Sequence, residues 1–244
     1  VSSSGQVDVD GRAREAEQGL AIDQLKITAN GLDMAALAGV SGLSLPSLTY
    51  AGDLTWSDNR LTLEGMFDAP QIAYSDYKVD GIVASGTYQV GGEDVEIASE
   101  FAINRVEGLP ESVASLVRDR LDGSLDARYV VANGRRDLRA LALSSADHRI
   151  DLAGARARDG TLDLAGSFAL ATIASLEEAS GDWTVQGKPS DGLRASLQGA
   201  VSPDPSRPEL IALVGSRAGV DVQLRSSSSG VLVETAELRS DIVS

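Results

Sequence analysis

The chain has 244 residues, a formal net charge of -15 and no cysteine; 43% of its residues are hydrophobic, but only 4% are aromatic. The negative charge argues against nucleic-acid binding, because neutralising phosphates requires clustered Lys and Arg. The lack of Cys excludes disulfides, thiolate metal sites and thiol nucleophiles. A core of Leu, Val, Ile and Ala without large rings favours a thin layer over a thick globule.

Short runs of alternating apolar and polar residues recur along the whole sequence, which is the period-2 pattern of strands with one buried face. We count about fourteen runs at the 8–12-residue spacing typical of strands joined by turns. Asp-Gly and Asn-Gly pairs, which favour tight hairpins, occur seven times. They are Asp10-Gly11, Asn30-Gly31, Asp80-Gly81, Asp122-Gly123, Asn133-Gly134, Asp159-Gly160 and Asp191-Gly192.

A degenerate repeat lies within this pattern. Residues 61–67 (LTLEGMF), 150–156 (IDLAGAR) and 162–168 (LDLAGSF) share two apolar residues one apart, followed by Gly. An interior Gly often marks a bulge or bend, and a sheet bent at the same place in successive strands becomes a trough. The sequence therefore predicts an all-β fold: an elongated antiparallel meander curved into a taco-like groove.

Three segments interrupt the alternation and are predicted as short helices: Leu32–Val40, Glu111–Leu121 and Ala171–Ser180. Pro110 suits the first turn of the second helix. An irregular loop is predicted over Ser202–Pro208, and it is the one candidate boundary in what otherwise reads as a single repeating segment, 1–244. No run of about 18 apolar residues occurs, and the N-terminus lacks the features of a signal peptide. We expect the chain to be an internal piece of a longer protein.

Enzyme-like fragments are few. His148 is the only histidine, so a triad or general base would depend on it alone. Ser57-Asp58-Asn59 and Ser75-Asp-Tyr-Lys78 imitate two β-lactamase motifs, but in reversed order and without K-T-G. Acidic pairs at Glu93-Asp94 and Glu177-Glu178, and the Asp8/Asp10 alternation, are expected to be solvated. A glycosidase pair or a calcium site has no supporting motif. We expect no enzyme, no cofactor and no metal.

The apolar faces of the strands are the main candidate for function. Two interpretations stay open on composition: the buried side of a closed core, or a groove for acyl chains, whose burial contributes about 0.8 kcal/mol per CH₂. If the groove exists, the strand alternation predicts that one set of residues lines it. These are Leu61, Leu63, Ile82, Val95, Ile97, Leu125, Ile150, Leu152, Leu162, Leu164, Phe168, Leu193, Leu197 and Val222.

The L-x-L-x-G units, the Gly31–Leu37 segment (GLDMAAL) and the passage from Leu109-Pro-Glu-Ser to Leu121-Asp-Gly-Ser-Leu125 resemble the AsmA-like and TamB proteins of Gram-negative envelopes. The resemblance covers most of the chain and is one of repeat texture. It implies a periplasmic β-groove that shields phospholipid acyl chains in transit between the inner and outer membranes. It also implies an inner-membrane anchor outside this segment and an outer-membrane partner similar to TamA.

Two other functions remain in view. One is a scaffold for assembly of outer-membrane β-barrel proteins, in which exposed strand edges pair with incoming strands. The other is a secreted, adhesin-like β-solenoid with a dry interior, although strict coil-length repeats are not visible.

Overall fold

The computed structural model describes residues 6–16, 19–32, 42–109, 114, 120–173, 175–227 and 230–240. This part of the chain holds fourteen strands and one short helix, α3 (Pro208–Val214). The strands are β1 (Gln6–Ala16), β2 (Gly19–Leu32), β3 (Leu43–Ser57), β4 (Arg60–Tyr74), β5 (Tyr77–Gly91), β6 (Asp94–Glu107), β7 (Leu121–Val130), β8 (Arg135–Ser144), β9 (His148–Arg156), β10 (Leu162–Ile173), β11 (Leu176–Lys188), β12 (Gly192–Pro203), β13 (Ala218–Ser227) and β14 (Gly230–Ser240).

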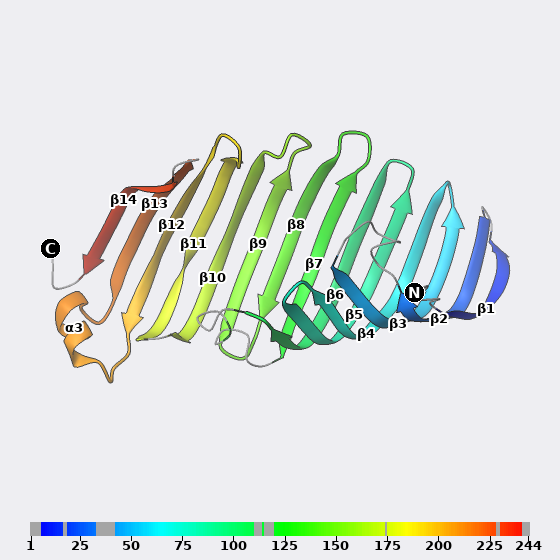
Figure 1. Ribbon diagram of the computed structural model, residues 1–244, viewed down its shortest axis with the longest axis horizontal. Helices are drawn as coiled ribbons and strands as arrows, with labels where there is room; N and C mark the ends of the chain where they lie inside the picture. The colour runs from blue at the N-terminus through cyan, green and yellow to red at the C-terminus, as the bar shows by residue number, and fades with distance from the viewer. Residues whose placement is uncertain are drawn as a thin grey trace. The chain divides into compact units, whose positions relative to one another are not determined.

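The chain divides into two compact units, Val1–Ala132 (unit 1) and Asn133–Ser244 (unit 2). Unit 1 contains β1 to β7 and unit 2 contains β8 to β14, and in each unit the strands lie in sequence order as an antiparallel meander (Figure 1). Residues 202–208 fall inside unit 2 and run from the last two residues of β12 to the first residue of α3. The single repeating segment 1–244 stays a prediction.

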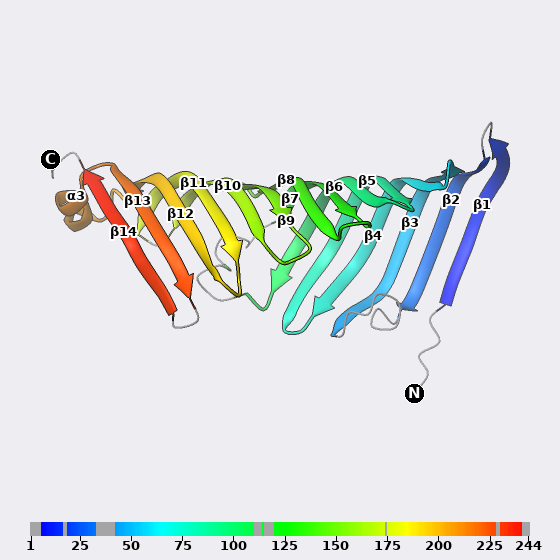
Figure 2. The ribbon, with the colours of Figure 1, turned by 90° about the horizontal axis from the view of Figure 1, so that it is seen from above.

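Neither meander closes on itself among the described residues, because β1 pairs with β2 alone and β14 with β13 alone. The strands of unit 1 curve along their length (Figure 2). The predicted fold class is confirmed: each unit is an all-β, open, curved antiparallel sheet with little helix. The backbone hydrogen bonds of every inner strand are satisfied by two neighbours, which is why long strands are stable here without a second layer.

Three of the seven predicted glycine turns are hairpin turns. Asn133-Gly134 and Asp159-Gly160 lie between two strands, and Asp191-Gly192 lies at the turn into β12, whose first residue is Gly192. The other four lie inside strands, at Asp10-Gly11, Asn30-Gly31, Asp80-Gly81 and Asp122-Gly123, and their assignment as hairpins is wrong. The ladder shifts register beside the first of them, which is the behaviour of a β-bulge.

The helix predictions have mixed outcomes. Leu32–Val40 and Glu111–Leu121 fall almost entirely outside the described residues. Ala171–Ser180 is not a helix but the hairpin between β10 and β11. A bulge between Leu176 and Glu178 puts the paired apolar residues Leu176 and Ala179 three apart, which imitates a helical period. The helix α3, in the described part of unit 2, begins with the Pro that ends the predicted loop Ser202–Pro208.

Candidate functional site

Cross-strand pairing divides each sheet into two faces, because directly opposed residues project to the same side. In unit 1 one face is a continuous set of apolar rows, and we call it apolar face 1. Its outermost row is formed by directly paired residues of six successive strands. These are Leu20, Trp56, Leu61, Val90, Val95 and Tyr129.

All six predicted lining residues of unit 1 lie on apolar face 1. Leu61 pairs with Val90, and Leu63 pairs with Tyr88 in the next row. The remaining four belong to the same face through the ladders of β5, β6 and β7. They are Ile82, Val95, Ile97 and Leu125.

Unit 2 repeats this division, and its apolar side is apolar face 2. Leu152 and Trp183 are both paired with Gly166, and Trp183 also pairs with Leu197. The eight predicted lining residues of unit 2 all belong to this face. They are Ile150, Leu152, Leu162, Leu164, Phe168, Leu193, Leu197 and Val222.

Burial on these faces is intermediate. All fourteen predicted lining residues are half-buried, neither sealed in a core nor fully exposed. Fully buried apolar residues number nine among those described, and five of the nine are alanines. The main contacts of the described strands are with their ladder neighbours, so no facing layer from the described part of the chain interlocks with the apolar side chains. In the outer row of apolar face 1, Leu20, Trp56 and Val90 remain 45%, 47% and 46% exposed.

Total surface area agrees with an uncovered face. The chain exposes 15148 Å². Two separate compact globules of half its mass would together expose about 12,500 Å². The excess is what an open sheet produces, since its apolar side stays accessible, and contiguous exposed apolar surface in soluble proteins marks a binding surface.

A crease crosses apolar face 1. Gly52 pairs with Gly65, and Gly65 with Gly86, so three successive strands have no side chain in one row. The backbones approach closely there: a Cβ on Gly52 would lie 2.6 Å from the Gly65 Cα, and one on Gly86 would lie 2.6 Å from the Ser99 Cα. Glycine is required in this row because any side chain would push the strands apart.

Tyr50 is the most buried large side chain of the described residues, with 2% exposed. Its hydroxyl donates a hydrogen bond to the Asp53 carbonyl oxygen at 2.8 Å. Desolvation raises the pKa of Tyr50, and the negative charge of Asp53 raises it further. The phenol is therefore held neutral and acts as a structural group rather than as an acid.

The polar face of unit 1 is held by an ionic cluster that sequence reasoning missed. Asp94 is only 3% exposed, and its carboxylate accepts hydrogen bonds from Arg60 and Arg128, each at 2.6 Å. Arg60 also donates to Gln89, and Arg128 lies 3.3 Å from Glu96. The expectation that the Glu93-Asp94 pair is solvated is wrong for Asp94, because two arginines from other strands cover it. The cluster ties β4, β5, β6 and β7 together.

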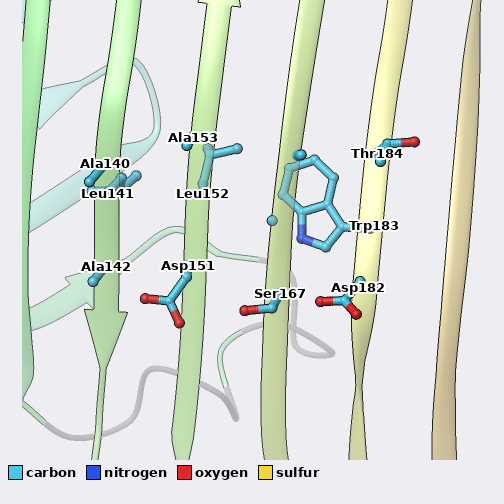
Figure 3. Close-up of a pocket in the computed structure, with 12 residues that line it drawn as sticks. Ala140, Leu141, Ala142, Asp151, Leu152, Ala153, Ser167, Asp182, Trp183 and Thr184 are labelled. Atoms are coloured by element: carbon cyan, nitrogen blue, oxygen red, sulfur yellow. The ribbon is translucent and has the colours of Figure 1, made fainter.

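Unit 2 has a shallow pocket of about 450 Å³ across β8, β9, β10 and β11 (Figure 3). Asp151, Ser167 and Asp182 are directly paired across three strands and belong to the polar face. The lining residues are Ala140, Leu141, Ala142, Asp151, Leu152, Ala153, Ala165, Gly166, Ser167, Asp182, Trp183 and Thr184. The lining therefore combines residues of the polar face with Leu152, Gly166 and Trp183 of apolar face 2.

The β-lactamase-like fragments occupy hairpin turns. Asp58 and Asn59 have φ values of 50° and 58° and form the turn between β3 and β4. Ser75 has φ 54° and lies in the two-residue turn between β4 and β5, directly before Tyr77 and Lys78. Neither fragment is arranged around a cleft with a second catalytic group.

His148 begins β9 and is half-buried; its Nδ1 accepts a hydrogen bond from the Ala171 backbone N–H at 3.3 Å. Glu177 and Glu178 are exposed on β11. Within the described residues, no group of three or more His, Cys, Asp or Glu is placed to hold a metal ion. In the same part of the chain, no helix has the length and apolar character needed to cross a membrane.

Several residues of the apolar faces were missing from the predicted lining. Trp56, Tyr88 and Val90 lie on apolar face 1, and Trp183 lies on apolar face 2. The signal that could have identified them is the same alternation, because Trp56 follows Leu54 at a spacing of two and Tyr88 precedes Val90. Trp183 is harder to assign, since Gly181 stands two residues before it and only Val185 continues the apolar alternation.

No protein-family model, curated protein or solved structure matches this chain.

Proposed function

We propose that apolar faces 1 and 2 bind the acyl chains of phospholipids, as the walls of a groove that carries lipid between the inner and outer membranes of a cell envelope. The observation that supports this most is the half-buried state of all fourteen lining residues on one-sided sheets with no facing layer among the described residues. The periplasmic location, the TamA-like partner and the membrane anchor belong to the same proposal and derive from the resemblance to AsmA-like and TamB proteins.

The energetics favour a long apolar ligand. Large side chains such as Trp56 and Val90 remain nearly half exposed, which is unfavourable in water. An acyl chain laid along these rows gains about 0.8 kcal/mol for each CH₂ that it buries, without any polar contact. The opposite face carries the ion pairs, and a net charge of -15 keeps the chain solvated while the apolar face is in use.

The two native tryptophans give a direct test, because both lie on apolar faces. Single-Trp variants are made with Trp183→Phe, which leaves Trp56, and with Trp56→Phe, which leaves Trp183. Each is loaded from vesicles of phosphatidylcholine brominated in the middle of one acyl chain and then repurified. We expect bromine to quench both tryptophans. A third variant without native Trp, carrying Thr62→Trp on the polar face, should not be quenched.

A substitution pair separates binding from folding. Leu63→Glu puts a charge on apolar face 1, whereas Thr62→Glu puts the same charge on the adjacent residue of the polar face. We expect Leu63→Glu to lower the amount of bound lipid severely and Thr62→Glu to leave it unchanged, with both variants folded by circular dichroism. Leu164→Glu and Ala165→Glu form the matched pair in unit 2. The proposal would be contradicted if the wild type bound no lipid and if Leu63→Glu and Leu164→Glu unfolded the protein while Thr62→Glu and Ala165→Glu did not.

The scaffold function has one supporting observation, the outer strand β14. Val231, Leu232 and Val233 are 69%, 62% and 56% exposed, and β14 pairs only with β13 among the described residues. An exposed apolar edge can add a strand from another protein. Photocrosslinking from position 232 to unfolded outer-membrane barrel strands would support this second function, and adducts with lipid alone would oppose it. A dry, solenoid-like interior is at odds with the half-buried apolar faces.

A further inference from the structure

Three aromatic rings from adjacent strands meet over the crease of apolar face 1. The ring centroids of Tyr50 and Phe67 are 4.8 Å apart, and those of Phe67 and Tyr88 are also 4.8 Å apart, with the latter pair edge to face at 87°. Tyr50 and Phe67 are directly paired, whereas Tyr88 comes from the row on the other side of the glycines. Together the rings span the row that has no side chains of its own.

The rings occupy the space that the glycines leave. The Tyr50 hydroxyl lies 2.6 Å from the position that a Cβ on Gly52 would take, so the phenol covers that glycine. Tyr50 is 2% exposed although no second layer covers the sheet in the described residues. An apolar molecule on this face therefore meets aromatic carbon before it can reach the glycine floor.

Hydrogen bonds hold two of the rings in place. Tyr50 is anchored to the Asp53 carbonyl at 2.8 Å. The hydroxyls of Tyr88 and Ser99 are 3.0 Å apart, and Ser99 Oγ donates to the Ser85 carbonyl oxygen at 3.1 Å. Moving either ring away would leave a polar group in an apolar environment without its partner, which is unfavourable. The two tyrosine rings therefore keep fixed positions on apolar face 1.

We propose that Tyr50, Phe67 and Tyr88 form an aromatic filler that sets the depth of the groove in unit 1. The filler excludes acyl chains from the crease and confines them to the side of the crease that contains Trp56, Leu61 and Leu63. This specifies which part of apolar face 1 takes the ligand, and it rests on the proposed function. The specificity-determining residue is Phe67, because it contacts both tyrosines and has no hydrogen-bonding role.

Phe67→Ala tests the filler in the full chain, in the Trp183→Phe background so that Trp56 is the only reporter. Removing the ring between two others opens a hollow of benzene size, and apolar hollows of this size bind benzene. We expect saturating benzene to raise the unfolding temperature of Phe67→Ala by roughly 2–4 °C and to leave the parent unchanged. Tyr129→Ala is the control, because Tyr129 is 39% exposed in the outer row and its removal leaves only open surface.

Lipid binding gives the second readout. With brominated phosphatidylcholine, Trp56 should be quenched equally in the parent and in Phe67→Ala, and mass spectrometry should find at least as much lipid in the variant. A folded Phe67→Ala protein that loses its lipid as Leu63→Glu does would overturn the filler, since Phe67 would then be part of the binding surface. So would a variant that gains no stability from benzene.

The two proposals fail separately. If Trp56 is unquenched in both proteins, the proposed lipid function is wrong, and so is the confinement of acyl chains to the Trp56 side of the crease. Benzene then decides whether the rings fill the crease: stabilisation of Phe67→Ala alone supports the filler, and its absence overturns it. If Trp56 is quenched and benzene has no effect, the lipid function stands and the filler is wrong.

Discussion

The two units place glycine differently on their apolar faces. In unit 1, Gly52, Gly65 and Gly86 pair directly, so the crease runs straight across three strands. In unit 2, Gly154 is paired with Leu164 and Gly166 with Trp183, so the glycines of β9 and β10 are offset by one cross-strand pair, and each faces a large side chain from a neighbour. Among the described residues of apolar face 2, glycine is paired directly with glycine only at Gly181 and Gly199, so the row without side chains spans two strands there instead of three.

The offset changes how the missing side chains are compensated. In β9 and β10 of unit 2 a neighbouring side chain fills each gap directly: a Cβ on Gly154 would lie 2.9 Å from a Leu164 methyl carbon, and one on Gly166 would lie 2.8 Å from the Trp183 ring. In unit 1 glycine is paired with glycine, so the gap is covered by aromatic rings from the rows on either side of the crease. The same residue type thus produces a continuous crease or isolated notches, depending only on register.

The largest effect is expected from a substitution in the glycine crease of unit 1. Gly65→Ala would place a methyl group against the Ala51 carbonyl oxygen and 2.6 Å from the Gly52 Cα, both of them backbone atoms that cannot rotate away. We expect a loss of about 3 kcal/mol in the free energy of unfolding, measured by urea denaturation. The control is Gly92→Ala, where a Cβ meets nothing within 4 Å and the change should stay within about 0.5 kcal/mol. Equal effects of the two would show that the crease does not need glycine.

The number of strands and the sidedness of the fourteen lining residues could be predicted from the sequence, because a period of two is intrinsic to the extended backbone. The crease could not. The pairing of Gly52 with Gly65 depends on the length of the turn at Asp58-Asn59, and the sequence had suggested hairpins at Asp10-Gly11 and Asp80-Gly81 instead. An Asp-Gly pair occurs at a bulge within a long strand as well as in a hairpin turn, so local composition does not predict which residues of neighbouring strands pair.

The buried ion pairs were unpredictable for a related reason. Asp94 is 34 residues from both Arg60 and Arg128 in the sequence, and only the ladder from β4 to β7 brings them together. An acidic pair at a turn is usually solvated, so Glu93-Asp94 gave no local sign of burial. The same holds for Trp183, whose position beside Gly166 depends on the register between β10 and β11.

The next largest effect is expected from disrupting the ionic cluster of unit 1. Asp94→Ala leaves two arginines without their shared carboxylate, and because each arginine side chain is more than one-third exposed, water offsets part of the loss. We expect unfolding to become easier by about 2 kcal/mol in urea, with faster amide exchange in β4 to β7. The matched variant Glu237→Ala in unit 2 removes an exposed partner of Arg239 and should cost less than about 0.5 kcal/mol. A cost for Asp94→Ala no larger than this would mean that the cluster does not stabilise unit 1.

A smaller effect concerns the buried phenol of unit 1. Tyr50→Phe keeps the ring over Gly52 but leaves the Asp53 carbonyl without its donor. The expected loss is about 1 kcal/mol by urea denaturation. Tyr129→Phe is the control, since that ring is partly exposed and water can replace its hydrogen bonds. If Tyr50→Phe is neutral while Phe67→Ala is strongly destabilising, ring packing rather than the hydrogen bond fixes the filler.

The smallest expected effect is a difference between the two units in how much stability they lose at acidic pH. The pKa is lowered at Asp80 in unit 1, first by a hydrogen bond from Gln71 and then by Lys78. In unit 2 it is lowered at Asp151 by a hydrogen bond from Arg149, at Asp159 by the Thr161 backbone N–H and at Asp204 by the Ser206 backbone N–H. A carboxyl whose folded pKa lies below its ordinary 3.8 contributes stability that is complete above that pH. The contribution is lost as pH falls through the folded value.

Acidification to about pH 3 should therefore weaken unit 2 more than unit 1, because three such groups act there against one. Amide exchange followed by mass spectrometry at neutral and acidic pH resolves β9 to β12 separately from β3 to β6. Asp159→Asn keeps an oxygen that can accept from Thr161 without a titrating charge, so it should reduce the acid sensitivity of unit 2 slightly. Equal acceleration of exchange in both units would show that exposed turn carboxylates are too well solvated to set the difference, and that acid acts mainly on the net charge of the whole chain.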